Sequence, residues 1–348
     1  MFSNRAFILD NTQLKDGSEE DIIRRILSSL PEKYQLDDAN LVASSDLYDS
    51  YRSEANGRFF NIKLSFDPES SALLREAETL QEIPNSIGPR FIHGDNLLIG
   101  KESLRYFVSS WDHAPDLLDL GRDIAVKESK KLSHTLRQMP KDSSARKFPE
   151  YLESVFQSCD FQSYFFSDSI LAIQDSSDWD KIDTILRSFK SEVTSRYNSF
   201  MDNSDSCLCH GNLQMSNILF RNDLFKFRNF DNAFVANQWF DVCNVVLSLG
   251  LTGNLEYDFV NTMAENLDLN KEEYQECLEM ASLIFLLNLF VEYFKEVYIF
   301  SSERLNIILD IINMLSQNIN RFQKLPVFKD NQDFIVKTIT EPILGIKS

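Results

Sequence analysis

The residues with the clearest chemistry lie in LCHGNLQMSNILF, residues 208–220, a short polar loop between two apolar runs. Asn212 follows His210 by two positions, and Asn217 follows Asn212 by five. This spacing is typical of a loop that catalyses phosphoryl transfer, in which a carboxylate takes the substrate proton and an asparagine helps to hold Mg²⁺. Asn212 stands at the carboxylate position, although an amide is uncharged and its oxygen is a very poor proton acceptor.

Two segments downstream carry further candidates. FKFRNFDNAF, residues 225–234, contains Asn229 and Asp231, and WFDVCNVVLSLG, residues 239–250, contains Asp241. Asp241 lies at the start of an apolar helical pattern, where an aspartate can cap a helix. Mg²⁺ favours carboxylate oxygens, so an amide at a metal position weakens the binding of the metal.

Together these segments resemble the aminoglycoside phosphotransferase and choline kinase-like family, whose members have a protein kinase-like fold. The family pattern is H-G-D-L-x-x-x-N-I-L, then I-D-F/W, then a further Asp that opens a helix. By this resemblance, Asn212 stands at the position of the catalytic base, and Asn217 and Asn229 stand at the two metal positions. His210 is expected to support the loop by hydrogen bonds, and Asp241 to brace it.

The second metal position is open between Asn229 and Asp231. In the family pattern, the metal-binding Asp and the helix-opening Asp are twelve positions apart. Asn229 precedes Asp241 by 12 positions, whereas Asp231 precedes it by 10. Arg228 argues the other way, because the family has Ile or Leu just before its metal-binding Asp. The spacing favours Asn229 as the degenerate metal position, and Asp231 remains the alternative ligand.

The same resemblance extends upstream, in the order that the family shows. It implies that Lys63 in NIKLSF holds ATP phosphates and that Glu76 in LLREAETL pairs with this lysine. RYFVSSW, residues 105–111, looks like the fifth strand and the adenine-contacting hinge, which places Ser109 and Trp111 among the cofactor-binding residues. The implied cofactor is ATP, with weak or absent Mg²⁺.

The elements that position these residues follow from the periodicity of apolar side chains and from turn signals. The predicted elements are a helix over 17–34, antiparallel strands over 40–66 with a turn at Asn56–Gly57, a helix over 70–83, short strands over 87–111, and mostly helices beyond 112, with strands and a loop over 207–235. This order predicts an α+β fold, namely a two-lobed protein kinase-like fold. Residues 1–109 form the small antiparallel-sheet lobe, and residues 110–348 form the larger, mostly helical lobe.

The turn expected over the phosphates, ASSDLYDSYRSE at residues 43–54, departs from a phosphate-binding loop. It contains no glycine, and without glycine the backbone approaches a phosphate less easily. Asp46 and Asp49 would also repel phosphate. The phosphate loop of this family depends less on glycine than that of protein kinases, so the missing glycine is only a moderate argument against phosphate binding.

The net charge of −18 argues against nucleic acid and anionic membranes as partners. It favours cationic small molecules or basic proteins, although keeping a chain with 28 Phe in solution also explains it. The five cysteines are scattered and predict no disulfide framework, which fits a cytoplasmic protein. The apolar stretch at 283–300 has a polar residue every fourth position, so it predicts a core helix and not a membrane span.

Two function classes remain open. The first is a pseudokinase that keeps the fold, has lost or very weak phosphotransfer, and binds a nucleotide, a metabolite or a protein partner. The alternative is an active ATP-dependent phosphotransferase that acts on a hydroxyl of a small, cationic molecule, with Asp231 or another acid in place of the missing carboxylates. Because both the base and a metal position carry amides, the pseudokinase is the favoured hypothesis.

Overall fold

The computed structural model describes residues 26–28, 39–44, 48–55, 57–65, 71–99, 102–158, 176–201, 206–294 and 305–345. Most of the helix predicted over 17–34, Asn56 of the predicted turn, Asp46 and Cys159 lie outside the described residues. The chain divides into two compact units, of which the first comprises Met1–Ala145 and Ser216–Ala233 and the second comprises Arg146–Met215 and Phe234–Ser348.

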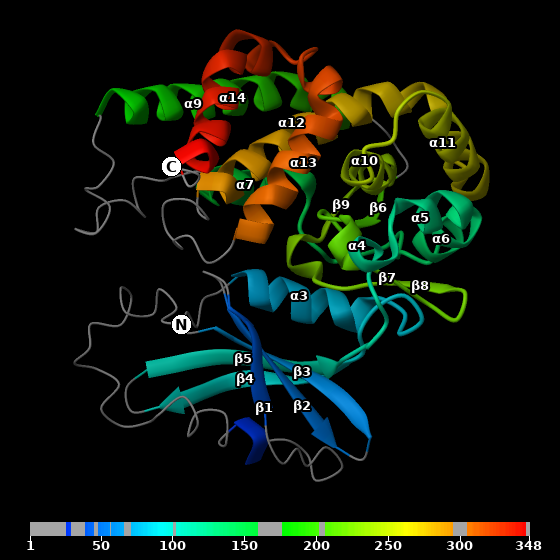
Figure 1. Cartoon of the computed structure of the whole chain (residues 1–348). Helices are drawn as coiled ribbons and strands as arrows, with labels where there is room; N and C mark the ends of the chain where they lie inside the picture. Colours follow the sequence, from blue (N-terminus) through cyan, green and yellow to red (C-terminus); the bar gives the residue numbers. More distant parts are fainter. Residues whose placement is uncertain are drawn as a thin grey trace. The chain divides into compact units, whose positions relative to one another are not determined.

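The first unit is built on a five-stranded antiparallel sheet (Figure 1). Its strands are β1 (Ala39–Ser44), β2 (Asp49–Ala55), β3 (Arg58–Ser65), β4 (Phe91–Ile99) and β5 (Glu102–Ser110), in the order β1-β2-β3-β5-β4. Successive side chains of a strand point to opposite faces. On β3, the alternate residues Phe60, Ile62 and Leu64 pack in one apolar core, so Lys63 points to the other face.

Helix α3 (Ser71–Glu82) packs against this sheet (Figure 1). Its buried side includes Leu73, Glu76 and Leu80, which are spaced three and four residues apart and so lie on one side of a helix. Two of these three residues are apolar and explain why the helix docks. The third, Glu76, is a carboxylate in a buried position and needs a partner.

The rest of the first unit comes from two distant parts of the chain. Its elements are α4 (Leu117–Leu120), α5 (Arg122–Lys127), α6 (Ser129–Leu136), β7 (Ile218–Arg221), β8 (Leu224–Phe227) and the 3-10 helix η3 (Phe230–Asn232). Strands β7 and β8 form a hairpin whose turn residues, Asn222 and Asp223, have φ of 52° and 64°. Asn and Asp tolerate such angles, which a tight hairpin turn requires.

This division differs from the lobe boundary predicted after residue 109. The backbone N–H of Phe227 donates to the carbonyl of Ile87 at 2.7 Å, and Ser86 Oγ donates to Gln138 Oε1 at 2.8 Å. Ser143 Oγ also donates to Glu82 Oε2 at 2.5 Å. These contacts join segments on both sides of residue 109 to one compact unit.

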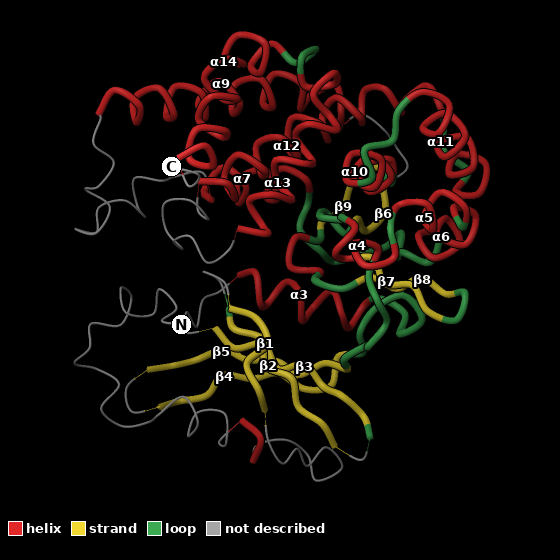
Figure 2. Tube along the Cα trace, viewed as in Figure 1, coloured by secondary structure: helices red, strands yellow, loops and turns green. Residues whose placement is uncertain are grey.

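The second unit is mostly helical (Figure 2). It contains the antiparallel strand pair β6 (Ser206–Cys209) and β9 (Phe234–Asn237), with the helices α7 (Phe148–Ser158), α9 (Ser176–Met201), α10 (Trp239–Ser248), α11 (Gly253–Leu267), α12 (Tyr274–Phe294), α13 (Leu305–Phe322) and α14 (Pro326–Gly345). Every residue of α10 is buried. An antiparallel sheet in the N-terminal part and a mostly helical remainder agree with the α+β prediction.

One helical stretch in the described part of the chain, Lys271–Tyr293, is long and apolar enough to cross a membrane by length and composition. Of its most apolar window, 72% is buried inside the protein. Its main helix, α12, packs against α9, α10 and α13. Such burial is typical of a core helix, which is what the sequence predicted for 283–300, although residues 295–300 lie outside the described residues.

Candidate functional site

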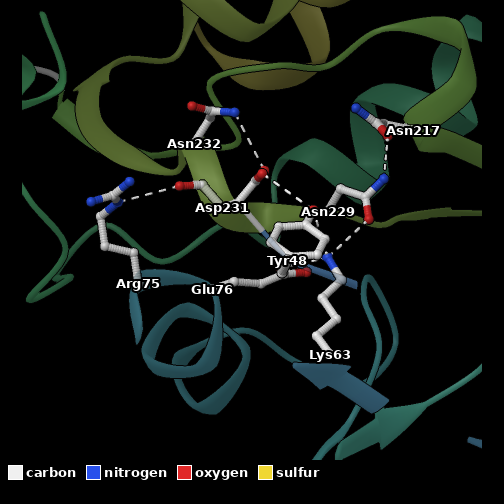
Figure 3. A network of polar contacts seen from close by, with 8 residues as sticks. All are labelled: Tyr48, Lys63, Arg75, Glu76, Asn217, Asn229, Asp231 and Asn232. Carbon is white, nitrogen blue, oxygen red and sulfur yellow. Dashed lines mark hydrogen bonds and ion pairs between the residues drawn. The ribbon is translucent and has the colours of Figure 1, made fainter. Parts of the chain in front are cut away.

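The ammonium group of Lys63 is the centre of a polar network in the first unit (Figure 3). Its Nζ donates to Glu76 Oε2 at 2.6 Å, to Tyr48 OH at 3.1 Å and to Asn229 Oδ1 at 3.2 Å. A lysine ammonium carries three N–H donors and no acceptor. All three donors of Lys63 therefore have an acceptor from the protein itself.

Glu76 is the strongest of these partners. The side chains of Lys63 and Glu76 are only 2% and 3% exposed, so the ion pair lies in a region from which water is excluded. Burial raises the pKa of Glu76, and the Lys63 charge opposes that rise. The strand lysine and the helix glutamate predicted to pair are thus in direct contact.

Asn229 and Asn217 extend the network away from Lys63. Because an ammonium only donates hydrogen bonds, it selects the oxygen of the Asn229 amide and leaves the amide NH₂ to find another partner. Asn229 Nδ2 donates to Asn217 Oδ1 at 2.9 Å. The backbone of Asn229 has φ 63° and ψ 67°, a left-handed conformation that asparagine tolerates well.

This pairing of amides does not fit Mg²⁺, which binds oxygen atoms that are free to face it. The oxygen of Asn229 accepts from Lys63, and the oxygen of Asn217 accepts from an NH₂ group. Among the described residues, no group of three or more His, Cys, Asp or Glu side chains is arranged to hold a metal ion.

Asp231 joins the network by a different route. It lies on η3 and not on an extended segment, so it does not share a strand face with Asn229. Its Oδ2 accepts from Tyr48 OH at 3.4 Å, and its Oδ1 accepts from Asn232 Nδ2 at 3.3 Å. Asn229 is thus in contact with both Lys63 and the other metal-position asparagine, whereas Asp231 reaches Lys63 through Tyr48.

Tyr48 and Arg75 are members of the network that the sequence did not predict (Figure 3). The ring of Tyr48 lies 4.3 Å from Lys63 Nζ, measured to its centroid, in addition to the hydrogen bond from its hydroxyl. Arg75 Nε donates to the backbone oxygen of Asp231 at 3.3 Å. The structure places residues 43–44 of the expected phosphate turn in β1 and residues 49–54 in β2. Tyr48 lies just before β2, and its position in the sequence gave no signal for a contact with Lys63.

Ser109 and Trp111 lie at the end of β5. Ser109 is buried and faces Asn61 across the β3–β5 pair, so it lies on the same face of the sheet as Lys63. The N–H of Trp111 donates to the carbonyl of Phe59 at 2.9 Å. Asn61 Oδ1 is a buried acceptor that has no hydrogen-bond donor within the described residues.

The remaining predicted residues are in the second unit, where Asp241 holds the loop. The carboxylate accepts from His210 N–H at 2.7 Å and from Gly211 N–H at 3.1 Å. His210 Nδ1 accepts from Asn212 N–H at 3.3 Å, so the imidazole supports the loop by a hydrogen bond. The structure thus groups His210, Asn212 and Asp241 in this unit, whereas the Lys63 network is in the first unit.

Asp241 is fully buried, and burial disfavours the ionised form of its carboxyl group. Burial raises the pKa of Asp241 to about 7. The hydrogen bonds from the backbone N–H groups of His210 and Gly211 lower the pKa, but the effect of burial is larger. A group whose pKa is raised in the folded state contributes stability at low pH and loses it as the pH rises through the folded pKa.

We therefore expect Asp241→Asn to remove a pH-dependent part of the stability. The difference in the free energy of unfolding between the natural chain and the variant should fall by a few kcal/mol between about pH 4 and pH 7 and stay level at higher pH. Urea denaturation at a series of pH values measures this difference. A difference that stays constant over the range contradicts the raised pKa.

No protein-family model matches the sequence, and no curated protein matches it. The structure is similar to those of aminoglycoside phosphotransferases. An aminoglycoside-3'-phosphotransferase of type VIII has 17% identity and a TM-score of 0.53, with 76% of this chain and 97% of that chain covered. An AMP-bound spectinomycin phosphotransferase has 15% identity and a TM-score of 0.56, covering 86% and 95%.

The GDP complex of aminoglycoside 2'-phosphotransferase-IIIa has 11% identity and a TM-score of 0.54, with 88% of this chain and 100% of that chain covered. These similarities confirm the predicted fold class, which is the protein kinase-like fold of aminoglycoside phosphotransferases.

Proposed function

We propose that this chain is a pseudokinase of the aminoglycoside phosphotransferase and choline kinase-like family, with phosphotransfer that is lost or very weak. The observation that supports the proposal most directly is the amide of Asn229. Its oxygen accepts from Lys63, and its NH₂ donates to Asn217. An amide in this arrangement supplies neither the charge nor the free oxygen that a catalytic metal needs.

The proposed ligand is a nucleotide or another small metabolite. The proposal also includes a protein partner. Structural neighbours include complexes with AMP and GDP, which supports a nucleotide. Lys63, Glu76, Ser109 and Trp111 are the proposed cofactor-binding residues. The buried Asn61 Oδ1 on the same sheet face supports a ligand that donates a hydrogen bond there.

The proposal includes weak or absent Mg²⁺ binding and a cytoplasmic location. It excludes nucleic acid and membranes as partners, and the net charge of −18 supports this exclusion.

An active phosphotransferase that acts on a small, cationic alcohol is the second candidate. The observation that favours it is the position of Asp231, whose carboxylate is joined to Lys63 through Tyr48. Among the residues proposed for the metal site, Asp231 is the one with a carboxylate. In this candidate it takes the metal-binding role in place of Asn229.

We expect no measurable transfer of phosphate from ATP to aminoglycosides, choline-like alcohols or sugar hydroxyls. Incubation with a library of hydroxyl compounds and detection of products by mass spectrometry tests this. Turnover at an ordinary kinase rate, about 1 per second or faster, would exclude the pseudokinase. If Asp231→Ala then abolishes both the turnover and Mg²⁺-dependent ATP binding, the second candidate holds.

A further inference from the structure

The three hydrogen bonds of Lys63 leave no N–H donor of its ammonium available for a phosphate oxygen. Its acceptors are Glu76, Asn229 and Tyr48. A phosphate that binds Lys63 must therefore replace one of these three groups, because an ammonium has no fourth donor.

The three acceptors differ in how firmly they are held. Glu76 is buried and carries the opposite charge, so its removal from Lys63 leaves a buried carboxylate without a cation. Asn229 is held on its other side by Asn217. Tyr48 is half-buried, lies just before β2, and donates to Asp231 at 3.4 Å, a longer contact than the 2.9 Å between Asn229 and Asn217. Tyr48 carries no charge and has this longer second contact, so it is the partner that a phosphate replaces most easily.

We infer that Tyr48 determines ligand specificity by closing the phosphate position at Lys63. This inference rests on the proposed function, because it assumes that the network belongs to a ligand site. With Tyr48 in place, the site accepts a nucleoside or a similar ligand without a phosphate at Lys63. A phosphate enters only when the tyrosine side chain moves away.

The surrounding charge favours this closed form. The hydroxyl of Tyr48 accepts from Lys63 and donates to Asp231 at 3.4 Å, so it connects an ammonium to a carboxylate (Figure 3). The ring also lies over the ammonium, which is a favourable cation–π contact. Asp231 holds the hydroxyl in place and repels an incoming phosphate.

The rate at which Lys63 reacts with an added reagent tests whether Tyr48 closes the phosphate position, and this test needs no natural ligand. Trinitrobenzenesulfonate, an anionic reagent for amines, is applied to the full chain, and the modification of Lys63 is followed by peptide mass spectrometry. We expect Tyr48→Phe to speed this modification about tenfold, since it removes one hydrogen bond to a charged group. Tyr257→Phe, a change at an exposed tyrosine, is the matched control and should leave the rate unchanged.

A second variant covers the case in which Asp231 itself closes over Lys63. Tyr48→Ala combined with Asp231→Asn removes both groups and should raise the rate at least as much as Tyr48→Phe. The rate at the partly exposed Lys226 serves as a folding control in every variant. Equal rates at Lys63 in the natural chain, Tyr48→Phe and the double variant would overturn the inference.

Calorimetry with adenosine and ADP, in the absence of Mg²⁺, measures the consequence for specificity. The natural chain should bind adenosine at least as tightly as ADP, and Tyr48→Phe should shift this preference toward ADP by about tenfold. An unchanged preference in a variant that binds both ligands also contradicts the inference. If none of the proteins binds either ligand, the nucleotide part of the proposed function fails, while the modification of Lys63 still decides whether Tyr48 closes the site.

Discussion

Lys63→Met should lower the free energy of unfolding by about 3–5 kcal/mol, because it leaves a buried carboxylate without its cation. The two side chains are 2% and 3% exposed and lie 2.6 Å apart, so solvent does not compensate Glu76. The substitution also removes the donor to Asn229 Oδ1. Since burial raises the pKa of Glu76, the variant should bind a proton there, and its deficit should grow as the pH rises.

Urea denaturation of three variants separates the charge effect from the loss of packing. Lys63→Met combined with Glu76→Leu removes both charges and should recover most of the lost stability. Lys226→Met breaks the partly exposed pair with Asp112, which should cost less than about 1 kcal/mol. If Lys63→Met and Lys226→Met cost the same, the buried position of the Lys63–Glu76 pair adds nothing to the stability of the fold.

The pairing of Lys63 with Glu76 was predictable through the family resemblance, which matches NIKLSF to the lysine strand and LLREAETL to the glutamate helix. Without the resemblance, a lysine on a strand and a glutamate on a helix are typical of an ordinary surface pair. The structure shows that the pair is buried, with Lys63 Nζ 2.6 Å from Glu76 Oε2. The motif spacing also predicted Asn217 and Asn229, which the structure brings into contact.

The contacts of Tyr48 were not predictable, because they depend on residues far away in the chain. Tyr48 and Asp231 are 183 positions apart, and no local pattern reports such a contact. The sequence also gave no sign that η3 would interrupt the extended segment after β8. That short helix decides that Asn229, and not Asp231, lies between Lys63 and Asn217.

The orientation of the Asn229 side-chain amide is a further feature that cannot be predicted from the identity of the residue. An asparagine at a metal position can present its oxygen or its NH₂ to a neighbour. Here the ammonium of Lys63 selects the oxygen, and the NH₂ then faces Asn217. The hydrogen bonding of this amide therefore depends on the combination of Lys63 with two asparagines, and not on one residue alone.

Asn229→Asp should convert this hydrogen-bonded pair into a site for a divalent cation. A carboxylate cannot donate to Asn217 Oδ1, so two oxygens would face each other where an NH₂ and an oxygen now pair. Mg²⁺ favours such an arrangement of oxygens. We expect ATP binding to this variant to become dependent on Mg²⁺, whereas binding to the natural chain should show little dependence.

Restoring the metal position alone should not restore turnover, because Asn212 still lacks the proton-accepting carboxylate. General acid–base catalysis contributes about 10²–10⁴-fold in typical enzymes. Asn212→Asp alone should likewise have little effect, since the base only takes the proton of the attacking hydroxyl or water, and the attack also needs a metal to neutralise the charge of the phosphoryl group. The combination of Asn212→Asp with Asn229→Asp should give slow ATP hydrolysis, and adding Tyr48→Phe should increase it by opening the phosphate position.

Calorimetry with a non-hydrolysable ATP analogue, with and without Mg²⁺, and a phosphate-release assay test these variants. Asn232→Asp is the matched control, because it makes the same change on η3 at a residue whose amide contacts Asp231 and not Lys63. If Asn232→Asp produces the same Mg²⁺ dependence as Asn229→Asp, added negative charge explains the result and the proposed metal position is wrong. If the Asn212→Asp/Asn229→Asp protein binds Mg²⁺–ATP tightly and still releases no phosphate, the loss of the two carboxylates does not explain the proposed lack of phosphotransfer.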